Sequence, residues 1–248
     1  MLANTIVMDA SSEWMAARAV QEGFMRFDAA VDGLDYSARC RQAKQLGGDC
    51  YVLEPLSDHR LALMVGDASG KGLAAALMIS NVQSSLRTAF LLTGSNAATA
   101  LRVVNRQVFG SSLEDRYATL FFAVFDEPTR TLRYVNAGHP PPMILRRDGS
   151  TVWLETGGAA VGLFSDWIYE EDVVRLSPGD IMIAYTDGLT EARSLDGHEW
   201  GAEGLRRAAV KSGAACAEDL VSALFTSLDE FSCTAQTDDA TLMAVRVR

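Results

Sequence analysis

The sequence lacks the signatures of several common protein classes. Its 248 residues contain no C-x-x-C pair and no cysteine–histidine spacing typical of zinc sites. No apolar run approaches the roughly 18 residues that a membrane helix needs, and the first residues have neither the basic region nor the apolar core of a signal peptide. We therefore expect a cytoplasmic protein without membrane insertion, in which the four cysteines are reduced and buried: Cys40, Cys50, Cys216 and Cys233.

Basic residues are also scarce. The chain has 22 Lys and Arg against 32 Asp and Glu, which gives a formal net charge of −10. An acidic surface argues against nucleic acid or an anionic membrane as the main partner. A phosphorylated substrate would have to be attracted locally, by a metal ion or by a few cations.

The stretch Gly66–Gly72, "GDASGKG", contains no nucleotide-binding motif. A P-loop needs four residues between its glycines and a Ser or Thr after its lysine, whereas three residues separate Gly66 from Gly70 and Gly72 follows Lys71. The G-x-G-x-x-G spacing of dinucleotide sites is missing too. A nucleotide-binding kinase or ATPase is therefore disfavoured, and Asp67 needs another explanation.

The apolar pattern predicts grouped hairpins and grouped helices, as in an α+β protein rather than one built from βαβ units. Short turns between several strands indicate antiparallel pairing. Strands are expected at 35–41, 49–55, 60–66, 118–126, 131–137, 141–147, 151–155, 168–175, 180–186 and 240–247, and helices at 71–92, 97–109, 201–211 and 216–230.

The N-terminal segment, residues 1–34, is predicted to be a linker, regulatory or dimerisation segment ahead of a larger domain at 35–248. Residues 11–30 have the spacing of an amphipathic helix. Its apolar face would pack on the rest of the chain or on a second copy, and it comprises Trp14, Ala17, Val20, Phe24 and Phe27.

Several aspartates share one context, because each lies at the end of a predicted strand. Asp49 begins a strand, Asp67 ends one, Asp187 follows "DIMIAYT", and Asp238 and Asp239 precede the last strand. A single strand-end aspartate is usually a turn or cap residue. If these strand ends meet, however, the carboxylates form a cluster that must be protonated or bind cations. Oxygen ligands without histidine or cysteine favour Mg²⁺ or Mn²⁺.

At these positions the sequence resembles the metal-dependent PPM serine/threonine phosphatases, relatives of protein phosphatase 2C, and in particular their bacterial SpoIIE-type branch. The resemblance covers about residues 35–247. It rests on six stretches in family order: "AKQLGGDCYV", "GDASGKGLAAALM", "YATLFFAVFDEPTRTLRYVNAGHPPPMIL", "GLF", "LSPGDIMIAYTDGLTEAR" and "DDATLMAVRV".

The resemblance implies a four-layer αββα sandwich with two central antiparallel sheets and two Mn²⁺ or Mg²⁺ ions between them. The implied catalytic metal ligands are Asp49, Asp67, the carbonyl of Ala68, Asp187 and Asp238. Asp239 is the nearest competitor for the last position, since a one-residue slip exchanges the two.

The sequence departs from the family pattern near the first aspartate. Val52 stands where a second acid is usual, and Gln42 stands where proline is common. The eukaryotic branch has a phosphate-gripping arginine near its first strand, and no residue is assigned to it here. Lys71 is a candidate for holding phosphate, with a solvated loop lysine as the alternative. His139, in "NAGHPPP", is expected to be structural.

The implied activity is hydrolysis of phosphoserine or phosphothreonine by a metal-activated water. The implied substrate is a phosphorylated anti-sigma-factor antagonist of the STAS type in a bacterial partner-switching pathway. A non-catalytic PPM-fold binding or regulatory module is the main alternative.

Overall fold

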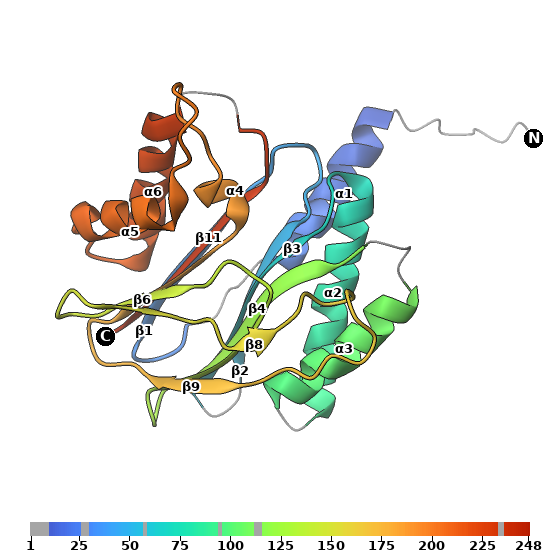
Figure 1. Cartoon of the computed structure of the whole chain (residues 1–248), viewed down its shortest axis with the longest axis horizontal. Coiled ribbons are helices and arrows are strands. Elements are labelled where there is room, and N and C mark those ends of the chain that lie inside the picture. Colours follow the sequence, from blue (N-terminus) through green and yellow to red (C-terminus); the bar gives the residue numbers. More distant parts are fainter. Residues whose placement is uncertain (1–9, 26–29, 57–58, 94–95, 112–115, 233–235) are drawn as a thin grey trace, which may run out of the picture.

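The structure, a computed structural model, describes residues 10–25, 30–56, 59–93, 96–111, 116–232 and 236–248. Two β-sheets pack face to face, and helices cover the outer face of each (Figure 1). The predicted four-layer α+β sandwich is thereby confirmed. Within the described residues no helix has the length and apolar character needed to span a bilayer.

Sheet A is antiparallel, and sheet B is antiparallel except for one short parallel pair, β5 with β8. In spatial order, sheet A consists of β1 (Leu34–Arg41), β11 (Ala240–Val247), β10 (Ile181–Tyr185), β6 (Met143–Leu145) and β7 (Thr151–Trp153). Sheet B consists of β2 (Asp49–Leu56), β3 (Arg60–Ala68), β4 (Ala118–Asp126), β5 (Thr131–Ala137) and β8 (Gly157–Gly158), with β9 (Asp172–Arg175) also paired to β5.

The helices form two outer layers (Figure 1). On the sheet B side lie α1 (Ala10–Phe24), α2 (Leu73–Leu92) and α3 (Ala97–Ser111); on the sheet A side lie α4 (Asp187–Thr190), α5 (Gly201–Ser212) and α6 (Ala217–Ser232).

Strand β3 shows why the chain forms these layers. Its side chains alternate, as a strand requires. Leu61, Leu63 and Val65 pack between the two sheets, whereas Ala62 and Met64 pack under α2 and α3. Both faces of β3 are therefore buried, and its sequence is a continuous apolar run that ends where Asp67 reaches the edge of the core.

The N-terminal helix differs from its prediction. It ends at Phe24 rather than near residue 30, and it faces the body of the molecule through Gln21 and Met25. Three residues expected on the packed face are exposed, namely Trp14 (38%), Val20 (60%) and Phe24 (40%), while Phe27 lies outside the described residues.

Helix α1 also contacts the loop that precedes Asp49. The Gln21 side chain donates a hydrogen bond to the Gly47 carbonyl (2.7 Å) and accepts one from the Gly47 N–H (3.2 Å). Gln42 donates another to Gln21 (2.8 Å). The N-terminal segment is thus linked directly to the loop that leads into β2.

Candidate metal centre and active site

The first two candidate aspartates face each other across a strand pair. Strands β2 and β3 run antiparallel, and their register places Asp49 directly opposite Asp67. Directly opposed residues point to the same face of a sheet with side chains about 5 Å apart. Asp49 and Asp67, which are distant in the sequence, are therefore neighbours at one end of the β2–β3 pair in sheet B.

The other two candidates come from sheet A at the same end of the sandwich. Asp187 begins α4 just after β10, and Asp238 lies just before β11. Gly188 makes this approach possible, because a Cβ at that position would lie 1.8 Å from the Asp239 carbonyl oxygen and 3.5 Å from the Asp238 Cβ. The glycine after Asp187 is therefore required for the two sheet A segments to meet.

Asp49 is bonded to sheet A although it belongs to sheet B. Its carboxylate is 1% exposed, and its Oδ2 accepts hydrogen bonds from the hydroxyls of Thr186 and Thr241, each at 2.7 Å. The Thr241 N–H in turn donates to the Thr186 hydroxyl (2.9 Å). This network fixes Asp49 between the two sheets, yet it supplies no positive charge.

The electrostatics of the cluster follow from burial and mutual repulsion. Burial, and then the charges of Asp187 and Asp238, raise the pKa of Asp67 to about 7. Burial followed by the charge of Asp67 raises the pKa of Asp49, and burial with the charges of Glu191 and Asp238 raises that of Asp187. A site that destabilises several carboxylate charges at once is suited to binding cations.

Asp238 and Asp239, which the sequence could not separate, have different surroundings. The two Asp239 oxygens accept the N–H groups of Ala43 and Gly48, each at 2.7 Å, so that Asp239 fixes the loop before Asp49. The charge of Asp239 also raises the pKa of Asp49 and Asp67, but Asp238 has the larger effect on the pKa of Asp67 and also raises that of Asp187. The geometry favours Asp238 as the acid that faces the cluster.

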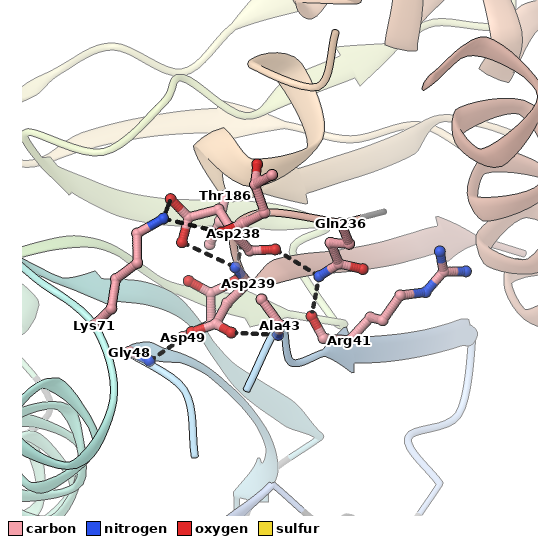
Figure 2. A network of polar contacts seen from close by, with 10 residues as sticks. Arg41, Ala43, Gly48, Asp49, Lys71, Thr186, Gln236, Asp238 and Asp239 are labelled. Atoms are coloured by element: carbon pink, nitrogen blue, oxygen red, sulfur yellow. Dashed lines mark hydrogen bonds and ion pairs between the residues drawn. The ribbon is translucent and has the colours of Figure 1, made fainter. Parts of the chain in front are cut away.

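Lys71 is the cation nearest to this cluster in Figure 2, where Lys71 and the Arg41 side chain lie on opposite sides of the acids. The Lys71 ammonium lies 2.7 Å from Asp238 Oδ2 and 3.1 Å from the Thr237 carbonyl oxygen. Its hydrogen bond with Asp238 raises the pKa of Lys71. Lys71 thus forms an ion pair with one of the candidate ligands, with its own side chain 45% exposed.

The donor set fits a hard divalent cation. Every candidate side-chain ligand is a carboxylate, and the Ala68 carbonyl lies beside Gly48, where a Cβ would be 3.0 Å from it. In the described part of the chain, however, no three Asp, Glu, His or Cys side chains converge closely enough to hold one ion as they stand. Binding an ion would therefore require the candidate side chains to move closer together.

Other residues singled out in the sequence serve the fold. Val52 is buried in the core under α2. His139 is 4% exposed, its Nδ1 lies 2.9 Å from the Thr119 hydroxyl, and burial lowers its pKa to about 3. Cys40, Cys50 and Cys216 are free thiols, of which only Cys50 is fully buried, and Cys233 lies outside the described residues.

Three functional candidates were missed from the sequence. Thr186 and Thr241 orient Asp49, and Glu191 acts on the charge of Asp187. The signal for Glu191 was its position four residues after Asp187, one helical turn away. The threonines stand beside candidate aspartates, but only the folded sheets show that they point at Asp49.

Comparisons with known proteins agree with this architecture. The family described as Stage II sporulation protein E (SpoIIE) matches residues 57–248, a range that includes Asp67, Asp187 and Asp238 but begins after Asp49. The chain is 28% identical to Protein IcfG of Synechocystis sp. over 92% of this chain and 40% of IcfG. It is 26% identical to phosphoserine phosphatase RsbU of Bacillus subtilis over 87% of this chain and 64% of RsbU.

A solved structure shows the same fold, and the family match covers most of the chain. The SiaA-PP2C domain of Pseudomonas aeruginosa superposes with a TM-score of 0.84, at 21% identity, over 96% of this chain and 97% of that domain. The chain spans less than two thirds of the two curated relatives. Its fold, its clustered strand-end aspartates and the match over residues 57–248 show that the chain belongs to the SpoIIE family of PP2C-like proteins.

Proposed function

We propose that this protein is a metal-dependent serine/threonine phosphatase that hydrolyses phosphoserine or phosphothreonine in a protein substrate. The observation that carries the proposal is the gathering of Asp49, Asp67, Asp187 and Asp238 from two sheets, with the pKa of three of them raised. Structural carboxylates are normally paired with cations when buried.

The four aspartates and the Ala68 carbonyl would hold two Mn²⁺ or Mg²⁺ ions. Bound ions would supply an activated water and neutralise charge on the phosphoryl oxygens. The chain's own residues prepare the site: Thr186 and Thr241 orient Asp49, and Asp239 holds the loop at Gly48. Lys71, whose ammonium donates a hydrogen bond to Asp238, would contact a phosphoryl oxygen of the substrate.

The residues present do not favour a covalent phosphoenzyme. Burial raises the pKa of the Cys40 and Cys50 thiols, which keeps them protonated and weakly nucleophilic. The buried His139 ring is held by Thr119 within the fold. Direct attack by water is therefore the reaction that this site supports best.

The proposed substrate is a cytoplasmic phosphoprotein, an anti-sigma-factor antagonist of the STAS type that takes part in partner switching. Support comes from relatives named as phosphoserine phosphatases, RsbU and RsbP of Bacillus subtilis. The alternative is a non-catalytic module that binds such a protein, which the pairing of Lys71 with Asp238 would suit.

We also propose that the N-terminal helix carries regulation through a homodimer. Met15 and Val20 of α1 are 65% and 60% exposed, and Leu77 of α2 is 65% exposed. Gln21 of the same helix is buried and contacts Gly47, in the loop before Asp49. A monomeric protein whose activity ignores removal of residues 1–30 would contradict this regulation.

The activity test is phosphate release from p-nitrophenyl phosphate and from a phosphoserine peptide, with Mn²⁺ or with EDTA. The proposal predicts turnover that needs Mn²⁺ and is lost in Asp187→Asn. Binding of the phosphopeptide without turnover at any Mn²⁺ concentration would instead support the binding module.

A further inference from the structure

A groove of about 490 Å³ extends from the candidate metal centre toward α6. One end is formed by Lys71, Gly188 and Asp238, which belong to the site already described. The other end is formed by Arg41 on β1, by Arg193 after α4 and by Asp229 on α6. Its volume is that of a ligand site rather than of a single phosphate group.

The charges of this groove differ from those of the whole molecule. The chain carries −10 overall, yet three cations line the groove: Lys71, Arg41 and Arg193. Of the lining carboxylates, Asp238 and Glu191 act on the charges of the acid cluster. The third lining carboxylate, Asp229, pairs with Arg41. The lining therefore has three cations and three carboxylates, so it is neutral in a chain whose net charge is −10.

The two arginines are held in different ways. Arg41 forms two hydrogen bonds with Asp229, at 2.5 and 3.2 Å, and its guanidinium lies 4.6 Å from the centre of the Phe225 ring. Arg193 makes one ion pair, 2.7 Å from Glu199, and its side chain is 66% exposed. Exposed pairs of this kind exchange readily, because they contribute about 1 kcal/mol or less. Arg193 is therefore the cation most accessible to an incoming carboxylate.

We propose that this groove binds the polypeptide that flanks the phosphorylated residue, and that Arg193 and Arg41 select flanks rich in Asp and Glu. The inference rests on the proposed phosphatase function and adds to it the substrate's local chemistry. The acidic surface as a whole would favour basic flanks, so the local groove and the global charge predict opposite preferences.

The test uses two phosphoserine peptides of equal length, one with three aspartates on each side of the phosphoserine and one with three lysines. We expect wild type at 0.15 M salt, where charges beyond about 8 Å are screened, to show a higher kcat/KM for the acidic peptide. Arg193→Glu should lower the acidic-to-basic ratio by up to about fivefold, the effect of one exposed ion pair. Glu199→Gln, which leaves Arg193 without its partner, should raise the ratio.

The matched control is Arg147→Glu, an exposed charge reversal in the turn between β6 and β7. It should leave the ratio unchanged. Affinity for both peptides is measured in parallel by fluorescence anisotropy, which gives the same ratio without turnover. A wild-type preference for the lysine peptide, or an Arg193→Glu ratio equal to that of Arg147→Glu, would overturn the groove assignment. Failure of wild type to release phosphate from p-nitrophenyl phosphate would instead count against the phosphatase function.

Discussion

A deeply buried carboxylate lies near each end of strand β10, and the two carboxylates have different partners. At its start, Asp180 is 2% exposed and pairs with Arg146 at 2.5 Å, while the Ser177 N–H donates to the same carboxylate. At its end, Asp49 is 1% exposed, and its carboxylate accepts the hydroxyls of Thr186 and Thr241 and lies in hydrogen-bond contact with another acid, Asp67. The same fold therefore neutralises one buried acid with a cation and leaves the other without one.

The difference separates a structural carboxylate from a functional one. Burying an unpaired charge is costly, so a protein retains it only where an ion or a proton compensates. At the Asp49 end, four further aspartates and Glu191 add like charge instead of relieving it. This excess of like charge is the feature on which the proposed cation binding rests.

The largest expected effect is the difference in phosphatase activity between Asp49→Asn and Asp180→Asn. We expect Asp49→Asn to reduce Mn²⁺-dependent phosphate release by at least about 10²-fold, the scale of losing one charge-stabilising group. Asp180→Asn should keep the wild-type kcat per folded molecule, because it lies at the other end of β10. Equal losses in both variants would erase the functional distinction between the two ends.

The free energy of unfolding should rank the same two variants in the opposite order, with Asp180→Asn the more affected. Asp180→Asn leaves the partly buried Arg146 without its carboxylate, so we expect a loss of about 3 kcal/mol in the free energy of unfolding. For a chain of this size that corresponds to a decrease in Tm of about 6–12 °C. Asp49→Asn should change Tm little in EDTA, or raise it, because it removes a like charge. Thermal unfolding followed by circular dichroism measures both variants.

A smaller effect is expected at Thr241, which orients Asp49. Thr241→Val keeps the shape but removes the hydroxyl, and we expect Mn²⁺ affinity to fall by about 10-fold, as for other residues that orient metal ligands. Thr241→Ser retains the hydroxyl and should retain the affinity. If Val and Ser variants bind Mn²⁺ equally, the hydrogen bond does not position Asp49.

The smallest effect is a pH dependence of the metal-free protein. The pKa of Asp67 is raised from its usual 3.8 to about 7, so the folded state binds its proton more tightly than the unfolded chain does. This contribution to stability is fully present below about pH 4 and is lost as the pH rises toward 7. We expect the free energy of unfolding in EDTA to fall with rising pH by up to about 1.4 kcal/mol per unit.

Denaturant titrations at several pH values measure that slope. Asp67→Asn has no such proton and should make the slope shallower, with Asp49 and Asp187 supplying the remainder, whereas Asp180→Asn should leave the slope unchanged. A metal-free protein that becomes more stable between pH 5 and pH 7 would contradict the repulsion assigned to the cluster.

Much of the fold could be predicted from local patterns. Strands 118–126, 131–137 and 240–247 begin and end where alternation and turn residues place them. The predicted strand 168–175 begins only at Asp172, because Tyr169 turns inward and its hydroxyl donates to Asn105 at 3.3 Å. Periodicity does not show such a contact between residues 64 positions apart.

The candidate site was predictable as a set of residue types but not as a geometry. Strand-end positions identified Asp49, Asp67 and Asp187, yet the sequence could not choose between Asp238 and Asp239. That choice depends on the Ala43 and Gly48 N–H groups, which reach Asp239 only after β1, β2 and β11 have assembled. Likewise, nothing local to Gln21 indicates that it contacts Gly47.

The most direct test of the account is a calorimetric titration of Mn²⁺ into wild type, Asp187→Asn and Asp180→Asn, the two variants representing the opposite ends of β10. The account predicts that wild type and Asp180→Asn bind two ions with similar affinity and that Asp187→Asn loses at least one of them. Indistinguishable titrations of wild type and Asp187→Asn, or no Mn²⁺ binding by folded wild type, would contradict it.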